Sequence, residues 1–308
     1  MFREQRVRSA LLSILAALVL LLTSVGAAGA SPSQATTPSP AGASNMSAAP
    51  PCAVTPFDAH NFSKPTKIDN QWLPLVPGTQ LTLEGSANPG PGVEPHRVVT
   101  TITNVTKVIN GVRTLVLWDR DYDAGQLAES ELAFFAQDSA GNVWNLGEYP
   151  EVYEDGEFVG APDTWIAGLR DAQAGIHMLA KPRVGTHRYL QGWAPDIDFL
   201  DCAKVFKKDQ KVCVPVSCYD NVLVTDETSP LEPGSGHQRK YHARGVGIVQ
   251  VGAVGDPEAE TLVLVKLVHL GPHDLAEACK AALKLDKHAY QVKPHLYGHT
   301  PHAQGPCS

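Results

Sequence analysis

Short runs of alternating apolar and polar residues, separated by turns, occupy the chain between positions 81 and 268. Residues 97–104 are rich in β-branched side chains, which favours a strand. Asn110-Gly111 follows, and this pair is a strong signal for a two-residue hairpin turn. The same pattern predicts further strands at 112–122, 126–136, 143–149, 211–215, 221–226, 238–242, 247–253 and 261–269. Strands joined by tight turns indicate an antiparallel meander.

A helix is predicted near the C-terminus, over residues 274–287. Its apolar stripe has helical spacing and consists of Leu275, Ala278, Ala282 and Leu285. Asp274, with Glu277 three residues later, suits the start of this helix. We therefore expect a mainly β protein, a single curved antiparallel sheet or open barrel of about ten strands, with this C-terminal helix packed on it.

The N-terminus has the pattern of an export signal. Arg3, Arg6 and Arg8 precede an uncharged apolar stretch, and Ala28-Gly29-Ala30 fits the small-residue site that signal peptidase cleaves. The apolar stretch is shorter than the roughly 20 residues that a membrane-spanning helix needs. We expect residues 1–30 to be a secretory signal peptide, which makes the mature protein extracytoplasmic, either secreted or in the cell envelope.

The rest of the chain divides into two parts. Residues 31–51 are rich in Pro, Ser and Ala and carry no charge, which is typical of a disordered leader. Residues 52–308 are expected to form one β-rich domain with a His-rich C-terminal tail and no transmembrane segment. The net charge of −7 becomes −9 once the signal peptide, with its three arginines and one glutamate, is removed. This acidic balance argues against nucleic acid as a partner.

All six cysteines follow the leader, and an even number of cysteines in an exported chain indicates disulfides. Cys202, Cys213 and Cys218 lie close together in the sequence, and Cys279 and Cys307 lie near the C-terminus. We expect one disulfide within the first group and one between Cys279 and Cys307. A thiolate metal site is the alternative, but the chain has no Cys-x-x-Cys pair.

Glu129 and Glu131 are two residues apart in a predicted strand, so their side chains face the same side. Such a pair can act in acid–base catalysis or bind a metal ion, but the interpretation that we favour is a solvated acidic surface. A two-residue loop before this strand would place Arg120 opposite Glu129 and form an ion pair. A three-residue loop would place Asp119 there instead. Turn chemistry favours the longer loop and charge pairing the shorter one.

Histidines are concentrated at the C-terminus, where the last 40 residues hold six of the 12. The spacings of His295, His299 and His302 allow two imidazoles to reach one ion. Zinc or copper is the metal that such a tail would bind outside the cytoplasm. A solvated loop is the alternative interpretation, and no cofactor is certain from the sequence.

The chain contains no Gly-x-Ser-x-Gly, His-Glu-x-x-His, P-loop, dinucleotide-binding or EF-hand motif. Whether the protein is an enzyme therefore stays open. A hydrolase would have to use carboxylates of the central hairpins, and the candidates are Asp119, Glu129, Glu131, Asp138 and Glu148. The candidate ligand-binding residues in the same region are Trp118, Glu131, Phe135 and Trp144.

Several stretches resemble a family of functionally uncharacterised exported bacterial proteins over about residues 70–268. Among these stretches are Trp72-Leu-Pro-Leu-Val-Pro-Gly, Ala136-Gln-Asp-Ser-Ala-Gly-Asn-Val-Trp and Lys240-Tyr-His-Ala-Arg-Gly-Val-Gly. The resemblance implies export and a β-rich domain. It implies nothing about mechanism. The concave face of the expected sheet is where small-molecule sites usually form, and we therefore expect a secreted, non-enzymatic binding protein for a small apolar or metal ligand. The alternative is an extracytoplasmic hydrolase that uses a carboxylate pair on a polymeric substrate.

Overall fold

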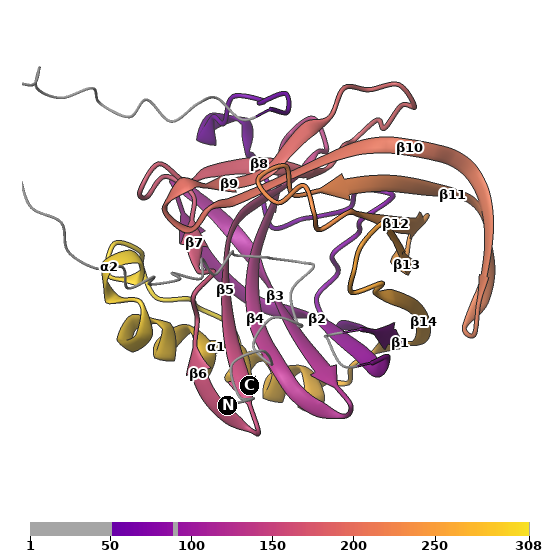
Figure 1. The fold of residues 1–308 in the computed structure, drawn as a ribbon. Coiled ribbons are helices and arrows are strands. Elements are labelled where there is room, and N and C mark those ends of the chain that lie inside the picture. Colours follow the sequence, from indigo (N-terminus) through magenta and orange to yellow (C-terminus); the bar gives the residue numbers. More distant parts are fainter. Residues whose placement is uncertain (1–50, 89–91, 308) are drawn as a thin grey trace, which may run out of the picture.

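The computed structural model describes residues 51–88 and 92–307, whose strands form an antiparallel barrel of 12 strands (Figure 1). Each barrel strand pairs with the next one along the chain. The barrel is closed where β1 (Thr79–Ala87) pairs with β14 (Thr261–His269). The predicted mainly β fold is confirmed, but the expected open barrel or single curved sheet is wrong. Closure satisfies backbone groups that an open sheet would expose along its edges.

The other barrel strands fall into two series. The first contains β2 (Glu94–Ile109), β3 (Val112–Asp123), β4 (Gln126–Gln137) and β5 (Val143–Glu154). The second contains β8 (Gln173–Met178), β9 (Tyr189–Ala194), β10 (Phe199–Val214), β11 (Ser217–Thr228), β12 (His237–Ala243) and β13 (Gly247–Val254). Two short strands, β6 (Glu157–Gly160) and β7 (Trp165–Ile166), pair with β5 beside the barrel. The predicted Asn110-Gly111 turn is confirmed, with φ of 46° and 78°.

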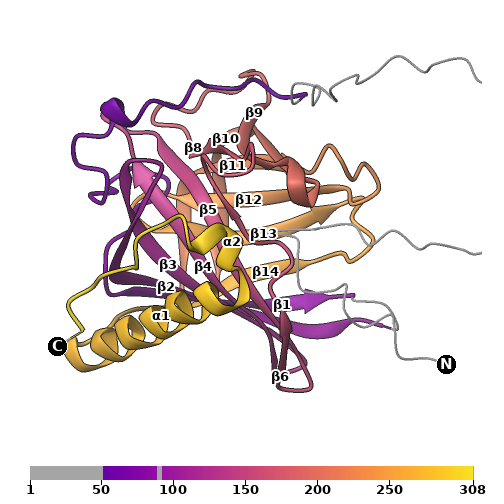
Figure 2. The ribbon, with the colours of Figure 1, turned by 90° about the vertical axis from the view of Figure 1, so that its left-hand side faces the viewer.

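The C-terminal helix α1 (Pro272–Val292) packs on the outer face of the barrel across β2, β3 and β4, and the short helix α2 (Pro294–Tyr297) follows it (Figure 2). Its buried apolar residues include the predicted Ala278, Ala282 and Leu285. The helix begins two residues earlier than predicted, at Pro272 after Gly271, because proline suits the first helical position. Strands β2 to β4 are therefore covered by α1 outside and by lumen side chains inside.

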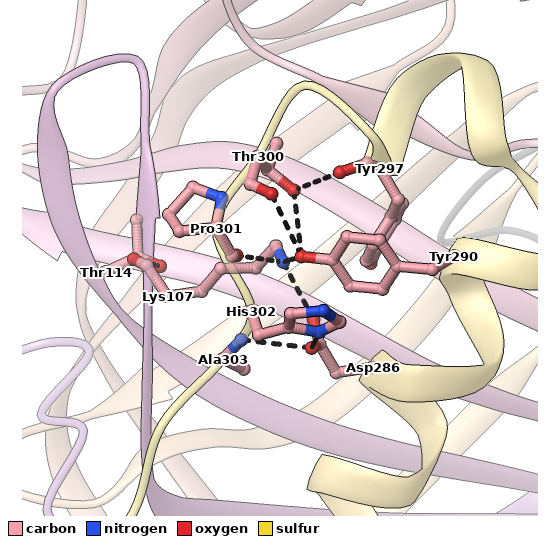
Figure 3. A network of polar contacts seen from close by, with 9 residues as sticks. All are labelled: Lys107, Thr114, Asp286, Tyr290, Tyr297, Thr300, Pro301, His302 and Ala303. Atoms are coloured by element: carbon pink, nitrogen blue, oxygen red, sulfur yellow. Dashed lines mark hydrogen bonds and ion pairs between the residues drawn. The ribbon is translucent and has the colours of Figure 1, made fainter.

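A buried ion pair fastens α1 to the barrel (Figure 3). Lys107 of β2 is fully buried, and its Nζ lies 2.8 Å from Oδ1 of Asp286 in α1. The same ammonium donates to the Tyr290 hydroxyl at 3.1 Å and to the Pro301 carbonyl at 2.8 Å. The second Asp286 oxygen accepts the Ala303 amide N–H at 3.0 Å. Helix, tail and barrel thus meet at one fully hydrogen-bonded lysine.

Three disulfides join segments of the described chain. Cys213–Cys218 closes the end of the β10–β11 hairpin, and Cys279–Cys307 ties α1 to the tail, as expected from the sequence. A third, unpredicted bond joins Cys52 to Cys202 across 150 residues. Disulfides in this number suit an oxidising, extracytoplasmic compartment.

The predicted signal peptide and almost all of the predicted leader fall on residues 1–50, outside the described residues. In the described part of the chain, no helix combines the length and hydropathy that crossing a membrane requires. Two single-turn 3-10 helices complete the fold, Ala59–Asn61 and Pro195–Ile197.

Candidate functional site

The β3–β4 hairpin carries four carboxylates on its inner face. Its loop has two residues, but a one-residue bulge follows and shifts the register. Asp121 therefore lies opposite Glu129, and Asp119 lies opposite Glu131. Both registers predicted from the sequence are wrong, because the observed one combines the short loop with a bulge. The expectation of a solvated acidic surface is also wrong, since Glu129 and Glu131 are 2% and 5% exposed.

These residues lie beside a cavity of about 160 Å³ in the barrel lumen. One side of the cavity is apolar, with Leu73 and Leu75 from the segment before β1, Leu81 from β1 and Phe135 from β4. The His177 ring lies edge-on to the Phe135 ring, with 5.1 Å between their centroids. This side can pack against the apolar body of a ligand.

Another part of the cavity lining is polar and mostly acidic. Its carboxylic side chains are Asp119, Glu131, Glu148, Asp201, Glu227 and Glu260. Lys240 is the single lysine or arginine among the described residues that line the cavity. These groups come from β3, β4, β5, β10, β11, β12 and the segment before β14, so only the closed barrel brings them together.

Lys240 is already paired. Its Nζ lies 2.9 Å from Oε2 of Glu227, and Oε1 of Glu227 accepts the Thr225 hydroxyl at 3.0 Å. Burial alone would raise the pKa of Glu227, but the Lys240 ammonium lowers it to about 2. Burial lowers the pKa of His177 to about 4 and that of His242 to about 3, so both imidazoles are neutral at pH 7.

Glu148 and Glu131 are neighbours in different surroundings. Glu148 accepts hydrogen bonds at both oxygens, from Asn145 Nδ2 at 2.6 Å and Trp165 Nε1 at 2.9 Å. Burial raises the pKa of Glu148 to about 7 although these donors oppose the shift. Glu131 accepts no hydrogen bond from the described residues, and burial, followed by the charges of Glu148 and Glu129, raises its pKa well above the usual range.

The remaining carboxyls extend this acidic wall. Burial raises the pKa of Asp119 to about 6 and that of Asp201 to about 7. Burial also raises the pKa of Asp121 and Glu129 well above the usual range, and each is raised further by acidic neighbours. Oε2 of Glu129 and Oδ1 of Asp119 are buried without a hydrogen-bond partner in the described structure. Most of this wall is thus uncharged or partly charged at pH 7.

A buried histidine lies beyond the acidic wall, on β2. His96 Nδ1 lies 2.7 Å from Oδ1 of Asp123, and Nε2 lies 3.1 Å from Oε1 of Glu260. Burial would lower the pKa of His96, but hydrogen bonds to both carboxylates raise it to about 10. This cation, like Lys240, is therefore neutralised by its own partners.

The structure brings some of the predicted site residues together and separates others. Glu131, Phe135 and Glu148 line the cavity, and Glu129 is buried on the same strand face as Glu131. The predicted Trp118 lies instead on the outer wall, in a groove between the barrel and α1. It alternates with the inward-facing Asp119, so one strand cannot direct both inward.

Trp144 and Asp138 also lie away from the cavity. Trp144 packs in the outer core, where its ring contacts Phe57 and Phe62. Asp138 lies in the β4–β5 turn, accepting the Trp144 indole N–H at 2.9 Å and backbone amides of its own turn. Both residues have local structural partners.

The predicted metal ligands are spread over the tail. His302 packs on Tyr290, with ring centroids 4.0 Å apart, and His295 lines a groove between α2 and the β7–β8 region. His299, which lies between these two histidines in the sequence, is exposed. Within residues 51–88 and 92–307, no group of three or more His, Cys, Asp or Glu residues is placed to hold a metal ion.

Sequence reasoning missed Lys240, Glu227, Asp201 and His177 as members of one site. Lys240 does lie in a predicted strand and Glu227 directly follows another, and in the structure each alternates with residues of the opposite face. That alternation was a usable signal. It could not identify the inner face, because the strands carry polar residues on both sides.

Comparisons with known proteins give no functional assignment. No known protein family matches the chain, and no curated protein matches it. A crystal structure from Bacteroides fragilis, described as "a putative exported protein with YmcC-like fold", is 13% identical, covers 64% of this chain and 98% of its own, and has a TM-score of 0.37. A "putative lipoprotein" from Parabacteroides distasonis is 11% identical, with the same coverage and a TM-score of 0.30. One neighbour is thus described as an exported protein and the other as a lipoprotein, and the likeness is too low to support an argument about function.

Proposed function

We propose that this exported protein is a non-enzymatic binding protein that takes a small ligand into the barrel lumen. The observation that carries the proposal is the mixed lining of the cavity, in which leucines and Phe135 adjoin acidic side chains. Ligand sites in proteins are typically enclosed and mainly apolar, with a few convergent polar groups. The lumen has this composition, whereas the grooves under α1 and beside α2 are on the outer wall.

The size of the cavity limits the ligand. A cavity of about 160 Å³ is comparable to one that accepts a benzene ring. The continuous wall of the barrel also favours a small molecule over a polymer chain, since a polymer needs an open groove.

A cavity-filling substitution tests the site. Ala133 lines the cavity and is 4% exposed, so Ala133→Leu should occupy the space that a ligand needs. We expect benzyl alcohol, a neutral probe of suitable size, to shift the NMR signals of lumen residues in the parent protein. Ala133→Leu should abolish these shifts, and Ala140→Leu in an exposed turn should not. Shifts confined to the outer grooves, or unchanged by Ala133→Leu, would overturn the proposal.

A second candidate function is hydrolysis of a small substrate, and one observation favours it. Glu131 and Glu148 are neighbours whose surroundings differ, which is how enzymes give two carboxyls separate acid and base roles. Nitrophenyl glycosides and esters would report such an activity. A hydrolase should lose its turnover in both Glu131→Gln and Glu148→Gln, whereas a binding protein shows no turnover at all.

A further inference from the structure

We propose that the ligand of the lumen is a small organic cation, an amine or a guanidinium on a short apolar body, whose charged end lies against Glu131 and Asp119. The inference rests on the proposed binding function and specifies its ligand. Three observations support it. They are the charge balance of the lumen, the carboxyl oxygens that accept no hydrogen bond, and the apolar residues that lie beside these carboxyls.

The charge balance leaves the acidic wall without a cation of its own. Lys240 is bound to Glu227, and His96 is bound to Asp123 and Glu260. The Glu148 oxygens are held by neutral donors. Asp201 accepts only the Ser229 hydroxyl among the described residues, at 2.6 Å. Asp119, Glu131, Glu148 and Asp201 therefore face the cavity without a basic partner.

Two side chains in this wall have carboxyl oxygens that accept no hydrogen bond from the described residues. Glu131 lines the cavity, is 5% exposed and accepts no hydrogen bond from the described residues. Asp119, directly opposite Glu131 on β3, has a buried Oδ1 without a partner. Buried polar groups in native proteins are nearly always satisfied. An ammonium or guanidinium N–H donor between these two strands would satisfy both groups.

The apolar side favours an organic cation over a bare metal ion. Ala133 and Phe135 follow Glu131 along the same face of β4, and Leu117 precedes Asp119 on the same face of β3. A charged group at Glu131 thus has an apolar surface directly beside it. Aromatic and aliphatic walls next to carboxylates match an amine with a short hydrocarbon body.

Binding of a cation should release protons. Glu131 is surrounded by Asp119 and Asp121 from β3, Glu129 from its own strand, Glu148 from β5 and, across the lumen, Asp201, Glu227, Lys240 and neutral His177. Burial and acidic neighbours disfavour the charged forms of Glu131, Glu148 and Asp201, and pKa values of about 7 leave Glu148 and Asp201 partly protonated at pH 7. A cation favours the charged form and displaces the proton. Affinity should consequently increase with pH over the range in which the amine stays charged.

The test compares two probes of the same shape. The disulfide-intact protein is titrated by calorimetry with benzylamine, a cation, and with benzyl alcohol, its neutral counterpart. At pH 8 we expect benzylamine to bind at least about tenfold more tightly, with release of about one proton measured from the difference between two buffers. The preference should shrink at pH 6.

The possible outcomes separate the two proposals. Equal or tighter binding of benzyl alcohol would overturn the cationic ligand and leave the binding function standing. Binding of neither probe would overturn both. Saturable binding of calcium or magnesium chloride that excludes benzylamine would assign the acidic wall to a metal ion and also overturn the inference.

Variants locate the charged end. Glu131→Gln keeps the side-chain shape and should reduce benzylamine affinity by more than tenfold while leaving benzyl alcohol binding unchanged. Glu84→Gln, on the exposed face of β1, should alter neither. Loss of both probes in Glu131→Gln would show a change in cavity shape, and retention of benzylamine affinity would place its charge elsewhere and contradict the proposal.

Discussion

At the scale of single residues, the chemistry of Glu131 departs strongly from that of an ordinary surface glutamate. Burial, with Glu148 and Glu129 nearby, raises its pKa well above the usual range. Such a carboxyl stabilises the fold while it is protonated. That contribution is complete below the pKa of the unfolded state and is lost as pH rises toward the folded pKa.

Glu131→Gln should therefore stabilise the protein in a pH-dependent way. One pKa unit corresponds to about 1.4 kcal/mol, so the free energy of unfolding should rise by more than about 1 kcal/mol at pH 8 and by clearly less at pH 5. Urea denaturation at the two pH values measures this. Glu84→Gln, the exposed control, should change stability by less than about 0.5 kcal/mol. Equal stabilisation at both pH values would contradict the buried, protonated state of Glu131.

The sequence predicted part of the arrangement of these side chains. The two-residue spacing correctly placed Glu129 and Glu131 on one face, because strand geometry alone determines that. The opposing residues were not predictable, since one bulged residue shifts the whole register. Trp118 was misplaced for a different reason. Alternation tells which residues share a face of the strand, but it does not tell which face is inside the barrel.

At the scale of elements, α1 is held by the buried Lys107–Asp286 pair. We expect Lys107→Met to cost about 3–5 kcal/mol, because it leaves the Asp286 carboxylate buried without its cation. The double variant Lys107→Met/Asp286→Leu should recover part of that loss. In contrast, Lys280→Ala should lower the free energy of unfolding by at most about 0.5 kcal/mol. Lys280 pairs with Glu277, and both side chains are more than half exposed.

Chemical denaturation of the four proteins checks this account of α1. A double variant less stable than Lys107→Met alone would contradict this account. It would show that the loss of stability does not come from a buried Asp286 carboxylate without its cation. The existence of α1 followed from its apolar stripe. The role of Lys107 did not, because Lys107 lies beyond the predicted strand 97–104 and a lone lysine is most often exposed.

At the scale of the whole molecule, most of the barrel strands were predictable, but β1, β8, β9 and the closure of the barrel were not. Hairpins between sequence neighbours follow from local turns such as Asn110-Gly111. Closure depends on β1 and β14, which are almost 200 residues apart, and local patterning carries no information about that pairing. β8 and β9 were missed because their short, largely buried segments show no period-2 alternation.

The lumen also makes the stability of the entire protein depend on pH. Burial raises the pKa of Glu148 and Asp201 to about 7, and hydrogen bonds raise that of His96 to about 10 against the effect of burial. In each case the folded protein holds protons that the unfolded chain releases, so stability falls as pH rises. Calorimetry of the unliganded protein should give a lower melting temperature at pH 8 than at pH 6.5. A higher one would contradict the protonated lumen.

The neutral histidines confine this prediction to the range above pH 6.5. Burial lowers the pKa of His177 to about 4 and that of His242 to about 3. The unfolded chain takes up these protons below its ordinary histidine pKa while the folded protein does not. Their contribution to stability is therefore lost as pH falls, which opposes the carboxyls below pH 6.5.

The most direct test of the account is a crystal structure of the protein soaked with benzylamine at pH 8. We predict a ring packed against Phe135 inside the barrel, with its ammonium within hydrogen-bonding distance of Glu131. Benzylamine bound only in the outer grooves, with the lumen unchanged, would contradict the central claim that this barrel encloses a ligand site.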